Sequence, residues 1–163
     1  MRIYGIVGWK NAGKTSLMER LVADIAGRGV TVSTLKHAHH AFDVDQPGKD
    51  SYRHRSAGAR EVLVSGGARW ALMSELRGEE EPPLAELLGR LTPVDLVLIE
   101  GWKRDPHPKI EAWRAETGRD LIAGDEKTVR ALAVKGVVET DLPCFDLDNT
   151  VAIAEFILGE VGL

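Results

Sequence analysis

A glycine-framed segment near the N-terminus has the spacing of a phosphate-binding loop. Gly8 and Gly13 enclose four residues, and Lys14 and Thr15 follow directly. In a P-loop of this form, backbone N–H groups and the positive end of the next helix hold the phosphates of a nucleotide. Lys14 would contact the β- and γ-phosphates, and the Thr15 hydroxyl would bind Mg2+. The spacing therefore predicts a nucleoside triphosphate site with a magnesium ion.

The other residues of this loop extend the predicted site. Lys10 would add a second cation, and the Asn11 side chain would hydrogen-bond the bridging phosphate oxygens. For both residues the alternative is an exposed polar position in a polar loop. The predicted phosphate-binding residues are Gly8, Lys10, Asn11, Ala12, Gly13, Lys14, Thr15 and Ser16.

A carboxylate at the end of a second apolar run is the candidate catalytic group. Residues 94–99 are almost all apolar, and Glu100 follows them. Open α/β sheets bind ligands at the carboxyl ends of their strands. Glu100 is therefore predicted to hold magnesium, through a water molecule, or to orient the attacking water. The alternative is a strand-terminal glutamate in solvent.

The polar segment of residues 36–59 is long for a loop in a compact domain, and such loops are usually functional or mobile. We expect it to respond to the bound nucleotide, with one aspartate, Asp45 in our assignment, as a magnesium ligand. A solvated polar loop and a transition-metal site are the open alternatives. The candidate metal ligands are His37, His39, His40, Asp43, Asp45 and Asp50.

A compact basic segment follows Glu100. It contains Lys103, Arg104, His107 and Lys109, and two prolines interrupt it. These side chains could hold a second anion near the γ-phosphate. A rigid, solvated turn is the equally weighted alternative.

Strands and helices alternate along the chain around these residues. Apolar residues 3–7 predict a strand before the P-loop, and Leu17, Leu21 and Ile25 predict a helix after it. We expect an α/β protein with a P-loop NTPase-like three-layer fold, a mostly parallel central sheet and one domain over residues 1–163. Further strands are predicted at residues 30–35, 61–64, 69–73, 94–99, 110–113, 121–123, 131–134 and 143–145, a helical turn at 125–130, and helices at 84–91 and 150–158.

The composition excludes several classes of protein. The chain has 163 residues, 44% of them hydrophobic and 28% charged, as in a soluble globular domain. The net charge of −4 argues against nucleic-acid binding. Cys144 is the single cysteine, so an intramolecular disulfide is impossible. No apolar run approaches the ~20 residues that span a bilayer, so we expect a cytoplasmic protein without membrane contact.

Taken together, these motifs resemble the MobB family, the molybdopterin-guanine dinucleotide biosynthesis adaptor proteins, which are P-loop GTPase-like. The resemblance rests on residues 8–15, 36–45, 48–51, 57–59, 96–103 and 108–111. It implies GTP and Mg2+ as ligands, weak GTP hydrolysis at most, and a homodimer. It also implies an auxiliary role to molybdopterin guanylyltransferase, the enzyme that attaches GMP to molybdopterin, with molybdopterin itself as a possible ligand.

No motif marks the residues that read the base, because the chain has no Asn-Lys-x-Asp guanine signature. GTP rather than ATP therefore follows from the resemblance alone. Asp125 could accept the guanine N1 and N2 hydrogens, and Lys135 could pack over the ring. A helix cap at Asp125 and an exposed turn residue at Lys135 are the alternatives.

A small-molecule kinase that uses ATP is the second hypothesis. The same loop would then pass the γ-phosphate to a bound acceptor. Kinases of this architecture usually cover the phosphates with an arginine-bearing lid. The best clustered candidates for such a lid are Arg53, Arg55 and Arg60.

Overall fold

The structure is a computed structural model that describes residues 1–38 and 42–163. Its contacts divide the chain into two compact units, one made of Met1–His37 and Leu91–Leu163 and the other of Ala38–Arg90. The two are called the first and the second unit below. One domain over the whole chain stays a prediction. The candidate metal ligands His39 and His40 lie outside the described residues.

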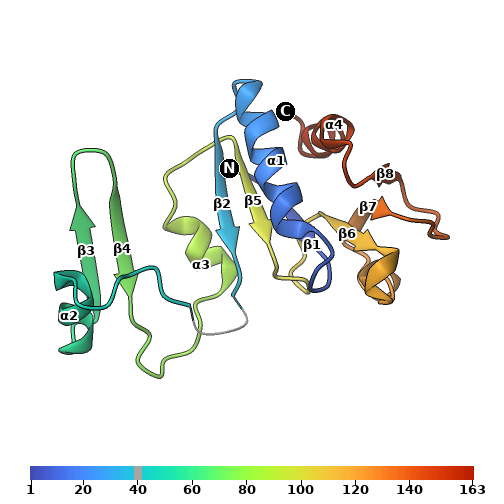
Figure 1. Cartoon of the computed structure of the whole chain (residues 1–163). Helices are drawn as coiled ribbons and strands as arrows, with labels where there is room; N and C mark the ends of the chain where they lie inside the picture. Colours follow the sequence, from blue (N-terminus) through green and yellow to red (C-terminus); the bar gives the residue numbers. More distant parts are fainter. Residues whose placement is uncertain (39–41) are drawn as a thin grey trace. The chain divides into compact units, whose positions relative to one another are not determined.

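The first unit is built on a six-stranded sheet with the order β2-β5-β1-β6-β7-β8 (Figure 1). Neighbouring strands in this sheet run parallel, which confirms the predicted α/β class. β1 lies in the interior of the sheet, so the loop that follows it emerges between the ends of β5 and β6. The strands are β1 Arg2–Val7, β2 Val32–Lys36, β5 Leu96–Glu100, β6 Lys109–Arg114, β7 Val129–Lys135 and β8 Cys144–Asp146.

Helices α1, Lys14–Gly27, and α4, Thr150–Val161, pack together with β1, β5 and β6 in the main apolar core. Leu17, Leu21 and Ile25 recur one turn apart on α1 and are fully buried. Each such side chain contributes about 1.5–3 kcal/mol through the apolar area that it removes from water. Among the described residues, no helix is long and apolar enough to cross a membrane.

A second apolar cluster is built on Val7, Val129 and Leu132, and residues 121–123 pack against it. These residues do not form the predicted strand, because Ile122–Gly124 is a 3-10 helix, η2. The predicted helical turn at 125–130 does not form a helix, since residues 125 and 127–128 are turns and β7 already begins at Val129. Another 3-10 helix, η1, spans Ala115–Thr117.

The buried carboxylate of Glu111 explains why η2 does not need a sheet partner. Its two oxygens accept hydrogen bonds from the backbone N–H groups of Ile122 and Ala123, each at 2.9 Å. Burial raises the pKa of Glu111, and these two hydrogen bonds act in the opposite direction. The N–H groups that a strand would pair in a ladder are thus satisfied by one side chain on β6.

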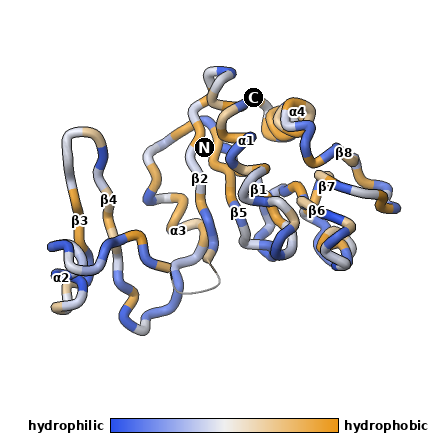
Figure 2. Tube along the Cα trace, viewed as in Figure 1, coloured by the Kyte–Doolittle hydropathy of each residue, from blue (hydrophilic) through white to orange (hydrophobic). Residues whose placement is uncertain are grey.

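The second unit contains the predicted hairpin. β3, Glu61–Ser65, and β4, Trp70–Ser74, pair antiparallel, and α2, Asp50–Ser56, and α3, Leu84–Gly89, complete the unit. Apolar residues run along both strands (Figure 2). Leu63 and Trp70 are more than 60% exposed and Leu72 is 44% exposed, so this hairpin presents large apolar side chains to solvent.

The basic segment after β5 is largely structural. Lys109 is fully buried, and its Nζ donates to the backbone oxygens of Asp105 at 2.6 Å and His107 at 2.9 Å and to the Thr128 hydroxyl. The His107 ring is buried beside Gly5, where a Cβ would lie 2.7 Å from its Nε2. Lys109 and His107 are therefore not available to bind a second anion.

The buried His107 should make stability depend on pH. Burial, followed by the nearby Lys109 charge, lowers the pKa of His107 from 6.5 to about 4. The unfolded chain binds this proton more readily, so the stabilising contribution is complete above pH 6.5. As the pH falls from 6.5 to 4 this contribution is lost, and the free energy of unfolding decreases by up to about 3 kcal/mol. Urea unfolding at pH 7.0 and pH 4.5 measures the change.

A variant without a titrating ring at position 107 tests this cause, and a second histidine variant serves as the control. His107→Gln should flatten the pH dependence, whatever its effect on stability at pH 7. His54→Gln, at an exposed position on α2, should leave the dependence as in the wild type. An equally steep loss in His107→Gln would show that other groups cause it.

Candidate nucleotide-binding site

The predicted P-loop joins the end of β1 to the start of α1. Its backbone takes left-handed conformations, with φ of 148° at Gly8, 66° at Asn11 and 95° at Gly13. A Cβ at Gly8 would lie only 2.4 Å from the carbonyl oxygen of Ala112 on β6. Glycine is needed at this position because of both the φ angle and the neighbouring backbone.

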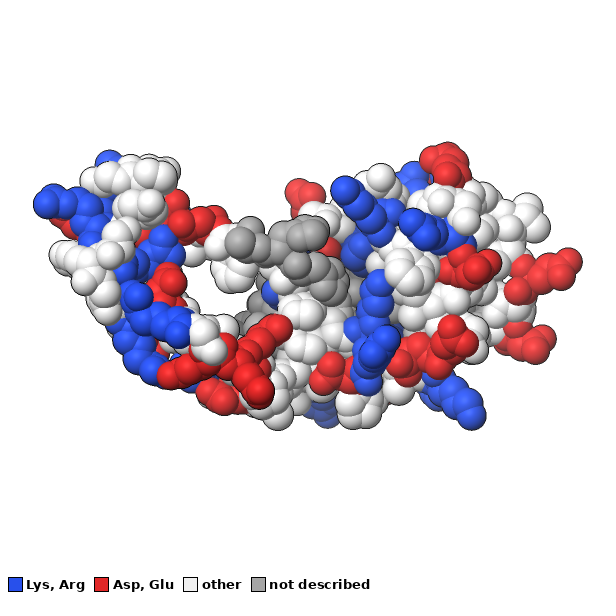
Figure 3. Space-filling model, turned by 90° about the horizontal axis from the view of Figure 1, so that it is seen from below, with Lys and Arg blue, Asp and Glu red and all other residues white. Residues whose placement is uncertain are grey.

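A cavity of about 340 Å³ opens at this loop and is lined by residues from the loop, α1 and β6. Most of the predicted phosphate-binding residues lie on its wall, and Lys and Arg side chains gather on this side of the first unit (Figure 3). Ala12 is buried beneath the loop, and Lys10 lies on a neighbouring cavity of about 500 Å³. The residues that line the first cavity are Asn11, Gly13, Lys14, Thr15, Ser16 and Arg114.

The Lys14 side chain folds back over its own loop, with Nζ donating to the Trp9 carbonyl oxygen at 2.8 Å. Burial lowers the pKa of Lys14, and the positive charges of Lys103 and Lys36 lower it further, whereas Glu100 acts in the opposite direction. A bound anion would offset the cost of keeping this ammonium group charged. The surroundings of Lys14 thus fit a phosphate group.

Thr15 and Glu100 lie together although they are far apart in the sequence. The Thr15 hydroxyl is 3.4 Å from Oε1 of Glu100, which is 8% exposed at the end of β5. The other oxygen of Glu100 is 3.6 Å from Nζ of Lys36 at the end of β2. A hydroxyl and a carboxylate beside a phosphate site are the kind of oxygen ligands that Mg2+ takes. The arrangement fits the predicted magnesium site.

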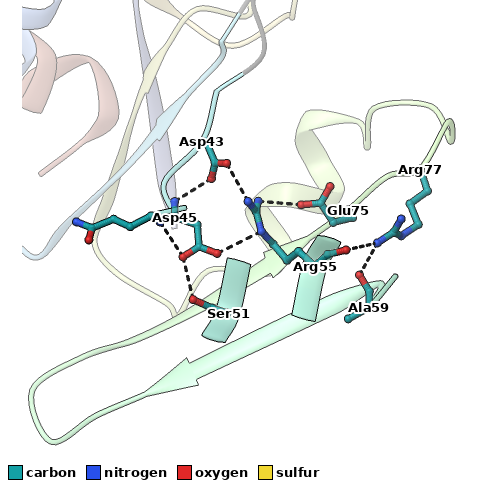
Figure 4. Close-up of polar contacts among 8 residues, drawn as sticks. Asp43, Asp45, Ser51, Arg55, Ala59, Glu75 and Arg77 are labelled. Atoms are coloured by element: carbon teal, nitrogen blue, oxygen red, sulfur yellow. Dashed lines mark hydrogen bonds and ion pairs between the residues drawn. The ribbon is translucent and has the colours of Figure 1, made fainter. Parts of the chain in front are cut away.

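Asp45 belongs to the second unit and is engaged there (Figure 4). Its Oδ1 accepts hydrogen bonds from the Ser51 hydroxyl at 2.8 Å and from the backbone N–H of Gln46 at 3.0 Å. Its Oδ2 lies 3.3 Å from Nε of Arg55. One oxygen is thus hydrogen-bonded, and the other is buried without a hydrogen bond beside the Arg55 cation. Magnesium binding by Asp45 stays a prediction.

The transition-metal alternative finds no support in the described part of the chain. Residues 1–38 and 42–163 contain no group of three or more His, Cys, Asp or Glu side chains that could hold a metal ion. Asp43 instead pairs with Arg55 at 2.8 Å, and Asp50 lies 3.7 Å from Arg53. With Asp45, all three aspartates of the candidate set are thus in ion pairs with arginines.

The two candidate base-reading residues lie in different surroundings. Lys135 ends β7 in register with Arg114, which lines the cavity. Its Nζ donates to the Asp148 carboxylate, and this hydrogen bond is the main cause of the raised pKa of Lys135. Asp125 is exposed and follows η2, and its N–H donates to the carbonyl oxygen of Ile122 at 3.0 Å. Asp125 therefore lies on the η2 turn and does not line the cavity.

Arg114 is a cavity residue that sequence reasoning missed. Its Nε and Nη2 lie 3.2 Å and 3.4 Å from the position of a Cβ on Gly13, and Nε is buried without a hydrogen-bond partner. The available signal was a basic residue at the end of a predicted strand. The strand order, which puts β6 beside β1, was needed to recognise it.

Trp9 also lies outside the predicted set. Lys103 Nζ stands 4.0 Å from the centre of its ring, and the indole N–H donates to the carbonyl oxygen of Asp120 at 2.8 Å. These contacts tie the P-loop to the segments on either side of β6. The residues around the neighbouring cavity are Trp9, Lys10, Asn11, Glu116, Thr117 and Arg119.

Most of the chain is similar to proteins of one family. Residues 3–135 match the model of the family described as molybdopterin guanine dinucleotide synthesis protein B, MobB. The molybdopterin-guanine dinucleotide biosynthesis adapter protein of Haemophilus influenzae is 39% identical over 156 residues, 95% of this chain and 86% of that protein. The protein of the same name from Escherichia coli is 35% identical over 161 residues, with coverages of 96% and 91%.

Solved structures of similar sequence share the fold. The crystal structure of Bacillus subtilis MobB has a TM-score of 0.77 at 28% identity and covers 99% of this chain and 98% of its own. A MobB protein homolog from Bacillus stearothermophilus has a TM-score of 0.69 at 26% identity, with 99% of both chains covered. The family match includes the P-loop, Glu100 and Lys135. Because the family model and these relatives match most of its length, the chain belongs to the MobB family.

Proposed function

We propose that this protein binds GTP and Mg2+ at the P-loop, hydrolyses GTP slowly and serves as an adaptor in molybdopterin guanine dinucleotide biosynthesis. The observation that carries the nucleotide part is the cavity at the P-loop, with the Thr15 hydroxyl 3.4 Å from the Glu100 carboxylate. The adaptor part is supported by family membership and by the names of the relatives in Haemophilus influenzae and Escherichia coli.

The proposed chemistry assigns one task to each side chain. The loop N–H groups and Lys14 bind the phosphates, and the Thr15 hydroxyl binds the magnesium ion. Magnesium would neutralise charge that develops on the phosphate oxygens. Glu100 would orient the attacking water or hold the metal through a water molecule, and Nζ of Lys36 lies 3.6 Å from its carboxylate.

The adaptor role requires a surface for a partner. The proposed partner is molybdopterin guanylyltransferase, with molybdopterin as a possible further ligand and a homodimer as the active form. In support, the hairpin of the second unit exposes Leu63, Trp70 and Leu72. Exposed apolar groups of this kind often mark protein interaction sites.

The kinase alternative has less support. Its lid would need arginines that are free to meet the phosphates. Arg55 instead contacts the carboxylates of Asp43, Asp45 and Glu75. Arg60 makes two hydrogen bonds with Glu79, each at 2.6 Å. Within the second unit, these two candidates already hold acidic partners.

Calorimetric titration with GTP and ATP, each with magnesium, tests the proposal. We expect GTP to bind in preference to ATP and hydrolysis to be slow. Addition of the guanylyltransferase, but not of small-molecule acceptors, should alter the hydrolysis rate. Preference for ATP together with a phosphorylated acceptor would replace the adaptor by a kinase.

Lys14→Ala is expected to abolish measurable GTP binding, a loss of at least about a hundredfold, because the cation on the β- and γ-phosphates is removed. Titration calorimetry measures the dissociation constant. Lys127→Ala, at an exposed position outside the loop, is the matched control and should bind GTP as the wild type does. Unchanged affinity in Lys14→Ala would contradict the phosphate assignment.

Glu100→Gln should slow GTP hydrolysis by roughly tenfold or more with little effect on GTP affinity. The substitution removes a negative charge beside Lys36, so anion binding has no electrostatic reason to weaken. Single-turnover hydrolysis and calorimetry separate the two quantities. Glu80→Gln, at an exposed position, is the control. If binding and hydrolysis fell together, Glu100 would instead be a magnesium-site residue.

A further inference from the structure

We infer that the turn after β8 reads the base of the nucleotide, and that the Asp148 carboxylate is the group that selects guanine. The inference rests on the proposed GTP binding and deepens it, because it names a residue for base specificity. It replaces Asp125 in this role and keeps Lys135 as its neighbour.

The turn that carries Asp148 touches the phosphate-binding loop. A Cβ on Gly13 would lie 3.1 Å from Cδ2 of Leu147, the residue before Asp148. Arg20 on α1 connects the two segments, since it donates to the Leu147 carbonyl oxygen at 2.7 Å and to the Ser16 hydroxyl at 2.8 Å. A nucleotide with its phosphates at Gly13 therefore has this turn as an immediate neighbour.

The turn holds a defined shape that presents one carboxylate. The backbone N–H of Leu147 donates to the Val134 carbonyl oxygen at 2.9 Å, which ties the turn to β7. Asp146 stabilises it from within, because its Oδ1 accepts the backbone N–H of Asp148 at 2.8 Å. The side chains of Asp146 and Asp148 are similarly exposed, at 59% and 57%, and both lie near Lys135. They differ in that one oxygen of Asp146 is engaged in the turn itself by accepting the Asp148 N–H.

The surrounding cations keep Asp148 ionised. A hydrogen bond from Lys135 is the main cause of the lowered pKa of Asp148, and the charges of Arg20 and Arg114 act in the same direction. An ionised carboxylate accepts hydrogen bonds at about four lone-pair positions, so Lys135 leaves room for two more donors. Arg114 links this group to the phosphate cavity, because it lines the cavity and pairs in register with Lys135.

A carboxylate in this position distinguishes the purines by their edges. Guanine presents two adjacent donors, N1–H and N2–H, to the two oxygens of a carboxylate. Adenine presents N1 as an acceptor, which repels a carboxylate and leaves it unpaired. A site built to pair with a donor strongly rejects an analogue that lacks it. Asp148 would therefore provide selection for GTP without an Asn-Lys-x-Asp motif.

Titration calorimetry with the magnesium complexes of GTP, ITP, XTP and ATP tests the inference. The wild type should bind GTP about tenfold more tightly than ITP, which lacks the 2-amino group, and should bind ATP and XTP weakly. In Asp148→Asn, the amide can accept from N1–H of xanthine and donate to its 2-oxo group. This variant should prefer XTP to GTP, a reversal that general damage to the fold does not produce.

Controls separate this residue from other aspartates. Asp141→Asn, at an exposed position before β8, should keep the wild-type order of affinities. A second variant, Asp148→Ala, removes both acceptor oxygens and should bind GTP and ITP equally. The inference is overturned if Asp148→Asn and Asp148→Ala keep the wild-type order, or if the reversal occurs in Asp125→Asn instead.

The wild-type titrations distinguish this inference from the proposed function. Equal binding of GTP and ATP would overturn guanine selection by Asp148 and leave triphosphate binding at the P-loop intact. If none of the four triphosphates bound, the proposed nucleotide function would fail, and the role of Asp148 would fail with it.

Discussion

The close approach of β1 and β6 at Gly8 is the constraint on which the candidate nucleotide site depends. A side chain at Gly8 would meet the Ala112 carbonyl oxygen at 2.4 Å, so the chain can leave β1 here only as glycine. This contact places Arg114, two residues further along β6, beside Gly13. The residues around the cavity therefore come from the P-loop and from a strand more than a hundred positions away in the sequence.

Buried charged and polar groups around β6 hold the loops on either side of this contact. Lys109 binds the backbone oxygens of the segment after β5, and Glu111 binds the N–H groups of η2. Each charge is stabilised chiefly by backbone groups, which buried ions require. Trp9 then joins the P-loop to both neighbouring segments, through Lys103 and through the Asp120 carbonyl oxygen. The site is thus supported by β6 and its two flanking loops.

The second unit has a different organisation. Its central ion pairs join Arg55 to Asp43, Asp45 and Glu75, and its hairpin leaves apolar side chains exposed (Figures 2 and 4). A two-stranded hairpin is marginally stable in water by itself, so these internal ion pairs and α2 matter for its fold. In the proposed adaptor, the first unit would bind the nucleotide and the second would supply apolar surface for a partner.

Local sequence patterns predicted most of the elements and the loop that carries the candidate site. The glycine spacing and the flanking apolar residues predicted strand, loop and helix, and the apolar run before Glu100 predicted β5; the family and the α/β class are confirmed. The strand predicted at residues 121–123 was wrong, because Glu111 satisfies their N–H groups from another strand. Likewise, Lys109 and His107 looked available for an anion but are buried. Arg114 showed only a weak local signal, a basic residue at the end of a predicted strand, and the strand order was needed to place it beside the P-loop. Periodicity and loop chemistry act between near neighbours in the chain, whereas strand order decides which distant side chains meet, and that is set by tertiary packing.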